Sequence, residues 1–383
     1  MTCGESILVS AGEVSGDHYI AMVAPFLRNG GFGGRIYGLC GEEARACGVE
    51  ALWDNGRLHV MGFSEVAGAL ADILRLMREV YREVIMARPK AMVVVDSPDF
   101  HLPLIRRLRR GGYHGKIFYI SPPSVWAWRS YRVKTLSSCV DLCLPLFKHE
   151  HDYLSLHGCK SLWKGHPLVE ELSVPVLDVD AVVGGIRGKV DRDGIVALLP
   201  GSRRSEIEAL YPLLSRAYDI ISERGYSPVF SVAPGLSEAA RASLVPRLES
   251  EGRVYYGGSG RDLMSVSRAA AGSSGTATAE ALLLRRYMVV MYKLRPLSAL
   301  IGKLLLSHLR FAIPNILAGE EFFPELIQSR ATGEAAAAAV LEWLESDAIA
   351  REERESRMEE LAGLMGETGI YGLWSDAITG AVS

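Results

Sequence analysis

The sequence is poor in cysteine, lacks any long uncharged hydrophobic run and has no excess of basic residues. Six cysteines occur in 383 residues and none forms a C-x-x-C pair, which argues against a disulfide framework and for a reducing cytoplasmic setting. No uncharged apolar stretch reaches the ~18 residues that span a bilayer, and the first ten residues lack the basic start of a signal peptide. With 42 Lys and Arg against 45 Asp and Glu, the charge does not favour a nucleic-acid partner.

Signatures of common cofactors and metals are also absent. No G-x-G-x-x-G follows the first apolar run, which argues against a nicotinamide dehydrogenase, and no G-x-x-x-x-G-K marks a P-loop. The two histidines of His149-Glu150-His151 diverge on a helix, and the H-E-x-x-H spacing is missing. We therefore predict neither a metal nor a cofactor, and we interpret these three residues as a solvated helix start.

The composition is that of a large globular protein. Hydrophobic residues make up 49% and charged residues 23%, so the chain can bury sizeable cores, and its length predicts two domains. Short apolar runs alternate with helical patterns, as expected of parallel strands covered on both faces. The predicted strands of the first half are Ile7–Ser10, Arg35–Leu39, Ala91–Asp96, Lys116–Ser121 and Val140–Leu146. The alternation restarts with Ile195–Leu199, Glu206–Arg224, Val229–Ala233, Arg253–Tyr256, Leu263–Ser267, Thr276–Leu284 and Tyr287–Tyr292.

This alternation predicts an α/β fold of two Rossmann-like, doubly wound domains. We place the first domain at residues 1–170 and the second at residues 194–347. Residues 171–193, which contain Pro175 and a Gly-Gly pair, form the predicted linker. Residues 348–383 are predicted to be a helical segment that packs back across the domains.

Ligands of such folds bind beyond the carboxyl ends of the strands, so the residues after each apolar run are informative. After the first run stands A-G-E-V-S-G-D (11–17). Its glycines, Gly12 and Gly16, let the backbone approach a ligand, and Ser15 or Asp17 is placed to cap the following helix. A tight strand-to-helix turn explains the spacing equally well, but such a turn does not require Glu13.

The third run ends in D-S-P-D-F (96–100). A carboxylate at the mouth of a sheet is partly desolvated, so its pKa can rise toward that of a general base. We assign Asp96 to this role and Asp99 to capping the next helix. The alternative is that Asp96 also serves only as a cap.

The loop S-P-P-S-V-W-A-W-R (121–129) carries two tryptophans beside stiffening prolines. Trp126 and Trp128 would offer a rigid stacking surface for a sugar or an acyl chain. Taken alone, the pair is better explained as part of the core.

Two loops of the second half have the composition of anion sites. L-P-G-S-R-R-S-E (199–206) joins an apolar run to a helix, and S-S-G-T-A-T-A-E (273–280) begins another helix. Free N–H groups and the helix dipole attract anions to such helix starts. We predict that the two loops hold a nucleotide diphosphate and that Glu280 accepts hydrogen bonds from ribose hydroxyls.

Residues 285–310 mix leucines with lysines and arginines. Their apolar residues recur at three- and four-residue intervals between basic ends, which suits a helix lying in an anionic membrane surface. A core-facing helix whose cations reach solvent is the alternative.

Taken in this order, eight segments resemble the lipid-A-disaccharide synthases, inverting glycosyltransferases with the two-domain GT-B arrangement and an interdomain cleft. The segments are A-G-E-V-S-G-D (11–17), V-M-G-F-S-E-V (60–66), D-S-P-D-F (96–100), S-P-P-S-V-W-A-W-R (121–129), G-H-P-L (165–168), L-P-G-S-R-R-S-E (199–206), S-G-T-A-T-A-E (274–280) and I-P-N-I-L-A-G with P-E-L-I-Q (313–328). Departures from the family pattern occur at Pro122-Pro123, at residues 147–150 and at residues 40–42, in loops that would shape the acceptor or lipid pocket.

The resemblance implies transfer of 2,3-diacylglucosamine from its UDP derivative to 2,3-diacylglucosamine 1-phosphate. The products would be the β-1,6-linked disaccharide 1-phosphate of lipid A and UDP, formed without a metal. It further implies a cytoplasmic enzyme of Gram-negative lipopolysaccharide synthesis that associates peripherally with the inner membrane. Self-association into a homo-oligomer is left open.

Together, the residues and the resemblance give a set of candidate roles. The catalytic candidates are Asp96 and Glu13. The UDP and diphosphate candidates are Gly201, Ser202, Arg203, Ser274, Gly275, Thr276, Glu280 and Asn315. The acceptor and lipid-sugar candidates are Gly12, Ser15, Gly16, Asp17, Met61, Phe63, Ser124, Trp126, Trp128 and Arg129. The membrane candidates are Arg295, Leu300, Lys303 and Leu304.

Two other classes of protein share parts of this pattern. Another GT-B enzyme, such as a UDP-GlcNAc 2-epimerase or a muramyl-type N-acetylglucosaminyltransferase, would use the same diphosphate loops without needing the basic amphipathic stretch. A non-catalytic nucleotide-sugar-binding protein would not need an acid such as Asp96 at the end of a strand.

Overall fold

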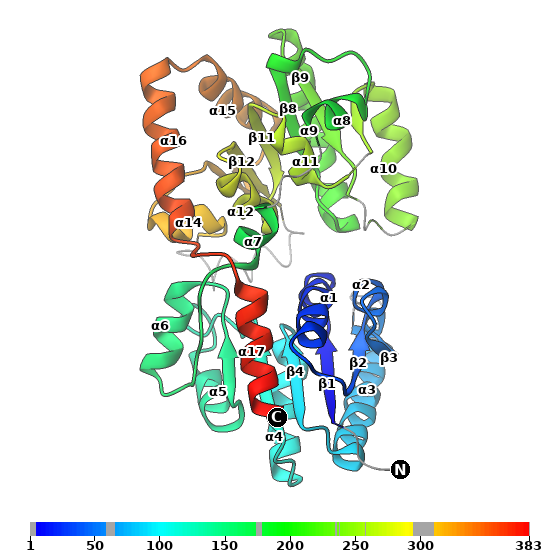
Figure 1. The fold of residues 1–383 in the computed structure, drawn as a ribbon. Helices are drawn as coiled ribbons and strands as arrows, with labels where there is room; N and C mark the ends of the chain where they lie inside the picture. Colours follow the sequence, from blue (N-terminus) through cyan, green and yellow to red (C-terminus); the bar gives the residue numbers. More distant parts are fainter. Residues whose placement is uncertain are drawn as a thin grey trace. The chain divides into compact units, whose positions relative to one another are not determined.

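A computed structural model describes residues 5–58, 66–173, 178–233, 236, 238–256, 258–293 and 310–382. The chain forms two compact units (Figure 1). The first comprises Met1–Glu170 with Met365–Ser383, and the second comprises Glu171–Leu364.

The first unit is built on a parallel sheet with the strand order β3-β2-β1-β4-β5-β6. Its central strand β4 is a fully buried apolar run, and β5 is buried from Ile117 onward, as expected where helices cover both faces. The strands are β1 (Ser6–Ala11), β2 (Arg35–Cys40), β3 (Glu50–Asp54), β4 (Ala91–Val95), β5 (Lys116–Ile120) and β6 (Leu142–Leu144). The helices are α1 (Val14–Asn29), α2 (Glu42–Ala46), α3 (Val66–Ala87), α4 (Pro98–Arg110), α5 (Val133–Cys139), α6 (Lys148–Leu156) and α17 (Ile370–Val382). Helix α7 (Pro167–Ser173) contains the boundary between the units.

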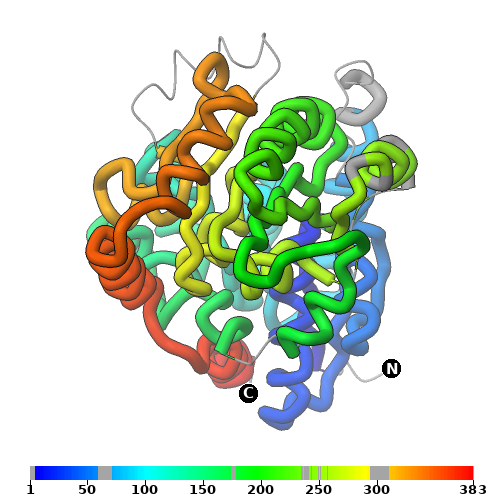
Figure 2. The backbone as a smooth tube through the Cα atoms, turned by 90° about the horizontal axis from the view of Figure 1, so that it is seen from above, coloured from blue at the N-terminus to red at the C-terminus, as the bar shows by residue number. Residues whose placement is uncertain are grey.

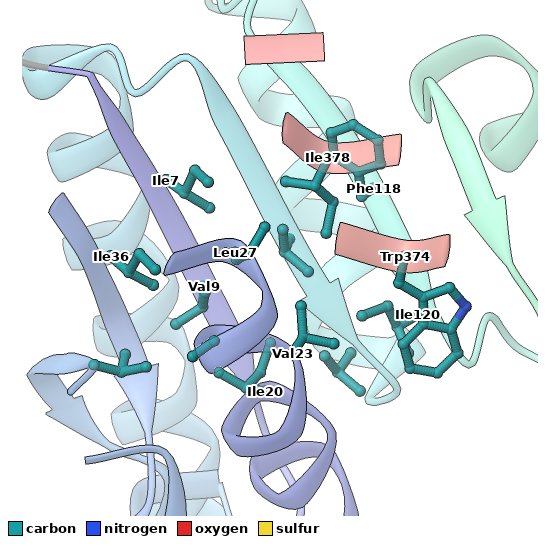
Figure 3. Close-up of a cluster of buried hydrophobic side chains, with 14 of the residues drawn as sticks. Ile7, Val9, Ile20, Val23, Leu27, Ile36, Phe118, Ile120, Trp374 and Ile378 are labelled. Atoms are coloured by element: carbon teal, nitrogen blue, oxygen red, sulfur yellow. The ribbon is translucent and has the colours of Figure 1, made fainter. Parts of the chain in front are cut away.

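The last helix of the chain completes the core of the first unit. Figure 3 shows Trp374 and Ile378 of α17 directed toward Phe118 and Ile120 of β5, in the cluster that also contains side chains of α1 and β1. Trp374 is only 1% exposed. Burying a large apolar side chain contributes roughly 1.5–3 kcal/mol, so α17 is an integral part of this unit.

The second unit contains a sheet with the order β13-β12-β11-β8-β9-β10-β7, in which β7 runs antiparallel to β10. Its strands are β7 (Ile186–Arg187), β8 (Ile195–Leu199), β9 (Ser227–Ser231), β10 (Val254–Tyr255), β11 (Ala269–Ser273), β12 (Tyr287–Tyr292) and β13 (Glu325–Ile327). Its helices are α8 (Val179–Gly184), α9 (Arg204–Glu223), α10 (Glu238–Glu251), α11 (Gly260–Ser265), α12 (Thr276–Leu283), α14 (Ile313–Ala318), α15 (Gly333–Glu345) and α16 (Ala348–Gly363). Helices α9 and α15 pack side by side (Figures 1 and 2).

Several segments differ from the sequence-based expectation. The predicted linker contains α8 and β7, and β7 extends the edge of the second sheet. The C-terminal segment, by contrast, does not contradict its prediction, because it is helical, with α16 in the second unit and α17 in the first. Residues 263–265 lie in α11, and the next strand is β11, which was not predicted because its residues are alanine, glycine and serine. These residues have a weak intrinsic preference for strands, but β11 lies between β12 and β8, and burial there outweighs that preference.

Each sheet reverses its strand order at one point. Counted from its own first parallel strand, each unit has the order 3-2-1-4-5-6, with the reversal between β1 and β4 in the first sheet and between β8 and β11 in the second. Ligands of open α/β sheets bind outside the carboxyl ends of the strands at such switch points. The loops after these four strands contain Gly12, Glu13, Asp96, Gly201, Ser202, Arg203, Ser274 and Gly275, and other predicted site residues lie near the starts of the helices that follow.

Candidate active site

The loops that follow β1 and β4 are packed against each other. Strands β1 and β4 pair in register, with Ala11 opposite Val95. A Cβ built on Gly12 would lie 2.2 Å from the Oγ atom of Ser97. One built on Gly16 would lie 3.3 Å from the side chains of Ala11 in β1 and Val95 in β4. The structure therefore brings the segments that carry Glu13 and Asp96 together at one edge of the first sheet.

Asp96 lies in a strained backbone segment. Its φ angle is 49° and that of Ser97 is 45°, both in the left-handed region, which costs about 1–3 kcal/mol per non-glycine residue. The carbonyl oxygen of Asp96 accepts from Tyr119 Oη at 2.8 Å and lies 2.7 Å from Nδ1 of His101. The half-buried Asp96 is therefore held by hydrogen bonds to its own backbone.

Asp99 does not cap α4, contrary to the prediction. The N-cap residue is Ser97, Pro98 occupies the first helical position, and Asp99 lies within the first turn. The Asp99 carboxylate accepts from Arg129 at 2.9 Å and also pairs with Arg132. It thus ties the start of α4 to the segment that follows the tryptophan loop.

Asp17 also has a different partner from the predicted one. The N-cap residue of α1 is Glu13, and Asp17 lies inside the helix. Its buried carboxylate accepts from the backbone N–H groups of Gly41 at 2.6 Å and Glu43 at 3.0 Å, at the start of α2. Asp17 therefore caps a neighbouring helix, whereas Ser15 is exposed.

The two tryptophans of the proline-stiffened loop lie in different environments. The Trp126 ring contacts His149 edge-on at 4.9 Å and is half-buried, as the core interpretation expects. Trp128 is 41% exposed, with the guanidinium of Arg129 5.5 Å from its ring. Only Trp128 thus presents a large part of its ring at the surface.

The start of α6 is less solvated than the sequence indicated. Glu150 is buried and accepts from the Ser124 hydroxyl at 2.7 Å. Burial raises the pKa of the Glu150 carboxyl, while its hydrogen bonds oppose the rise. His149 is partly buried as well, and burial lowers the pKa of its ring. The prediction of a solvated helix start is therefore wrong, because the tryptophan loop covers this turn.

Six predicted contacts lie outside the described residues. They are the acceptor candidates Met61 and Phe63 and the membrane candidates Arg295, Leu300, Lys303 and Leu304.

The loop after β8 approaches the end of β11 in the second unit. Gly201 has a φ of 108°, and a Cβ there would lie 2.6 Å from Glu206 Oε2 and 3.3 Å from Ser273 Oγ. Arg203 is the N-cap residue of α9, and its side chain is 70% exposed. The first N–H groups of a helix lack intrahelical partners, so this loop presents donors and a guanidinium at the carboxyl edge of the sheet.

The loop after β11 has an open backbone. Gly275 is the N-cap residue of α12 with a φ of 127°, and a Cβ at this position would have no heavy atom within 4 Å. Ser274 precedes it, and the exposed Thr276 begins the helix. Because Leu199 and Gly272 pair across β8 and β11, both predicted anion loops lie at one switch point.

Glu280 lies one turn further along α12 and is half-buried. Burial raises the pKa of Glu280 to about 7, with smaller contributions from Glu171 and Asp262, while Arg261 acts in the opposite direction. In its protonated form this carboxyl is able to donate as well as accept a hydrogen bond.

Asn315 is buried, and its side-chain amide is hydrogen-bonded within the protein. Its amide nitrogen donates to Phe323 O and Glu325 Oε1, and its oxygen accepts from the backbone N–H groups of Phe322 and Phe323. A side-chain amide has two donors and two acceptor positions, so all four are used. Asn315 therefore holds the turn before β13 in this structure, and its contact with UDP stays a prediction.

A model of the lipid-A-disaccharide synthetase family matches residues 7–368. The chain belongs to this family. Curated relatives named lipid-A-disaccharide synthase include one from Azotobacter vinelandii, 36% identical over 343 residues, which cover 88% of this chain and 89% of the relative. Another, from Syntrophus aciditrophicus, is 33% identical over 370 residues, which cover 96% of this chain and 94% of the relative. Family membership confirms the predicted class, a glycosyltransferase of lipid A biosynthesis.

Solved structures confirm the predicted fold class. A putative UDP-N-acetylglucosamine 2-epimerase from Listeria monocytogenes has a TM-score of 0.64 at 11% identity, over 99% of this chain and 96% of that one. The calicheamicin glycosyltransferase CalG4 has a TM-score of 0.56 at 13% identity, over 99% and 98%. Both support two Rossmann-like α/β units of the GT-B type. The family model, and not these structures, separates the chain from the epimerases.

Several residues that organise these loops were not predicted from the sequence. His101 and Tyr119 hold the Asp96 backbone, Arg132 pairs with Asp99, and Arg261 lies 3.8 Å from Glu171 near Glu280. Each contact joins residues that are distant in the sequence or lie on different elements. The position of His101 just after D-S-P-D-F was the one available signal.

Proposed function

We propose that this chain transfers 2,3-diacylglucosamine from UDP-2,3-diacylglucosamine to 2,3-diacylglucosamine 1-phosphate. The reaction inverts the anomeric centre and yields the β-1,6-linked disaccharide 1-phosphate and UDP. The observation that carries the proposal, together with the family assignment, is the pair of switch points. One presents carboxylates and the other presents helix N-termini with an arginine.

In the proposed mechanism, Asp96 removes the proton from the acceptor 6-hydroxyl as the oxygen attacks the anomeric carbon. A single displacement through an oxocarbenium-like state gives inversion. Glu13 orients a sugar at the same edge of the first sheet. A base of this kind contributes about 10²–10⁴-fold to the rate.

The leaving group is the β-phosphate of UDP, on which negative charge develops. We propose that Arg203 and the backbone N–H groups at Gly275 and Thr276 stabilise that charge. Preorganised donors accelerate a reaction when they interact more strongly with the transition state than with the substrate. We further propose that no metal takes part, and turnover unaffected by EDTA is the expected result.

The direct test is incubation of the purified chain with both lipid substrates, followed by mass spectrometry. We expect the disaccharide 1-phosphate and UDP in equal amounts. Formation of free N-acetylmannosamine derivatives from UDP-GlcNAc, with no disaccharide, would instead support the epimerase alternative.

The role of Asp96 has its own test. Asp96→Asn keeps the size of the side chain but removes the base, so kcat is expected to fall about 10²–10⁴-fold. UDP affinity is expected to stay unchanged, because the proposed UDP residues belong to the second unit. An Asp96→Asn enzyme with near-wild-type kcat would remove this assignment.

Residues 287–292 of the predicted basic stretch form the buried strand β12. We therefore propose peripheral membrane association through residues 293–310 only, because their leucine spacing and basic residues suit an anionic surface. Within the part of the chain that the structure describes, no helix is both long and apolar enough to cross a membrane. The test is co-sedimentation with anionic and with neutral vesicles. Binding to anionic vesicles that high salt abolishes is the expected result, and equal binding to both vesicle types would contradict the proposal.

A further inference from the structure

A buried histidine stands behind the candidate base, and the proposed mechanism does not use it. His101 is in α4 and is 0% exposed. Its Nδ1 atom lies 2.7 Å from the carbonyl oxygen of Asp96, and its Nε2 atom lies 2.8 Å from Oγ of Ser10 in β1. The ring therefore connects the end of β4 to the neighbouring strand.

The two partners determine which ring nitrogen carries the proton. A carbonyl oxygen only accepts hydrogen bonds, so Nδ1–H of His101 donates to Asp96. Burial lowers the pKa of His101 to about 4, so the ring is neutral at physiological pH and its Nε2 accepts from the Ser10 hydroxyl. The hydrogen bonds thus run in one direction, from Ser10 through His101 to the backbone of Asp96.

The carbonyl that receives this hydrogen bond belongs to the strained segment. Asp96 and Ser97 both have left-handed φ angles, which persist only where surrounding contacts hold them. Tyr119 of β5 donates a second hydrogen bond to the same oxygen. Two donors on one carbonyl fix the plane of the peptide that follows Asp96, and with it the direction of the Asp96 Cα–Cβ bond from which the carboxylate extends.

We propose that His101 is a positioning residue for Asp96, whose Nδ1–H holds the Asp96–Ser97 peptide in the orientation that directs the carboxylate at the acceptor hydroxyl. The inference rests on the proposed role of Asp96 as the base. A displacement of a reacting group by 1 Å costs up to about 10²-fold in rate, so losing this hydrogen bond acts on kcat. Substrate binding does not depend on it.

Two substitutions separate the two hydrogen bonds of the ring. His101→Asn places an amide near the Nδ1 position and keeps a donor for the Asp96 carbonyl. His101→Gln reaches the Nε2 position, toward Ser10, and leaves that carbonyl without the donor. Each variant removes one hydrogen bond from the same buried site, so a purely structural role predicts similar losses of thermal midpoint and of kcat for both.

Steady-state kinetics of the whole enzyme with both lipid substrates provide the test, alongside thermal unfolding and the Asp96→Asn variant. We expect His101→Gln to lower kcat about tenfold or more at unchanged KM, and His101→Asn to keep kcat within about threefold of wild type. Equal kcat values for the two variants would overturn the positioning role. An active Asp96→Asn enzyme would overturn the proposed base itself, so the two failures are distinguishable.

Tyr119→Phe gives an independent measurement should the histidine variants not fold. It removes the other donor to the Asp96 carbonyl and leaves the ring in place. We expect a lower kcat with unchanged KM for both substrates. A wild-type kcat in folded Tyr119→Phe, with an inactive Asp96→Asn, would count against control of the base through this carbonyl.

Discussion

Gly12 and Ser97 are in such close contact that any side chain at residue 12 would overlap the serine hydroxyl, 2.2 Å from the position of a Cβ. Gly12 follows β1 and Ser97 lies in the loop after β4, and these are the two strands at the switch point of the first sheet. The glycine is therefore required by space rather than by a left-handed backbone. The contact fixes Glu13 and Asp96 on adjoining loops.

Gly12→Ala tests whether this contact matters for catalysis. The added methyl group would lie 2.2 Å from Ser97 Oγ and 2.9 Å from Leu58 Cδ1, so both side chains must change rotamer, and 3.0 Å from Ser97 Cβ, so the residue 97 loop must also shift slightly. We expect kcat to fall about tenfold or more, because small displacements of catalytic groups are costly. Gly33→Ala is the matched control in the same unit, since a Cβ there meets no atom within 4 Å. Similar kinetics for the two variants would show that the contact does not position the base.

Arg203→Ala tests the proposed diphosphate site. Hydrogen bonds to charged groups contribute about 1.5–3 kcal/mol, so UDP is expected to bind roughly 10- to 150-fold more weakly. Arg204→Ala is the control, because Arg204 is the next residue and pairs with Glu208 on the surface of α9. Isothermal titration with UDP measures both. Unchanged UDP affinity in Arg203→Ala would exclude the arginine from the site.

The raised pKa of Glu280 predicts that the free energy of unfolding depends on pH. Burial raises its pKa in the folded state from 4.5 to about 7, so the folded protein holds this proton more tightly than the unfolded chain. The contribution of Glu280 is therefore most favourable below pH 4.5 and is lost as the pH rises through 7. At 1.36 kcal/mol per pKa unit, the change is of the order of 3 kcal/mol.

Glu280→Gln isolates this effect, because the amide does not ionise. We expect the variant to exceed wild type in urea midpoint at pH 8 and to match it more closely at pH 5. Arg261, Glu171 and Asp262 surround the carboxyl and are retained in both proteins. A difference between the two proteins that does not change with pH would contradict the shifted titration.

Asp17→Ala separates a structural role from substrate contact. Asp17 satisfies backbone N–H groups at the start of α2, and losing such a capping carboxylate costs about 1–3 kcal/mol. We expect a lower urea midpoint with an unchanged KM for the acceptor. Glu42→Ala, at an exposed position of the same helix, is the control. A raised acceptor KM at unchanged stability would restore the predicted acceptor contact.

Much of the fold follows from the sequence because buried parallel strands have a simple signal. The strand Ile195–Leu199 was predicted with the bounds that the structure shows, since five consecutive apolar residues in a chain of alternating runs and helical patterns favour a covered strand. Strand β3 was missed because it is a half-buried edge strand, in which exposed and partly buried residues alternate. Strand β11 was missed because alanine and glycine carry little strand preference.

The sequence predicted where each loop of the site lies along the chain, but it did not predict the contacts that the side chains make. Glycines and acids after strands identified the loops around Asp96, Gly201 and Gly275, which the structure places at the two switch points. The sequence motifs that contain Asn315 and Asp17 did not reveal that these side chains accept hydrogen bonds from the backbone of other segments. Those partners are set by tertiary packing, which one sequence does not encode in local spacing.

The central claim is that UDP binds at the switch point of the second unit. A crystal structure of the enzyme with UDP tests it most directly. We expect the diphosphate within hydrogen-bonding distance of the backbone at Gly275 and Thr276 and of the Arg203 guanidinium, with the ribose near Glu280. Nucleotide density far from residues 201–206 and 274–280 would contradict it.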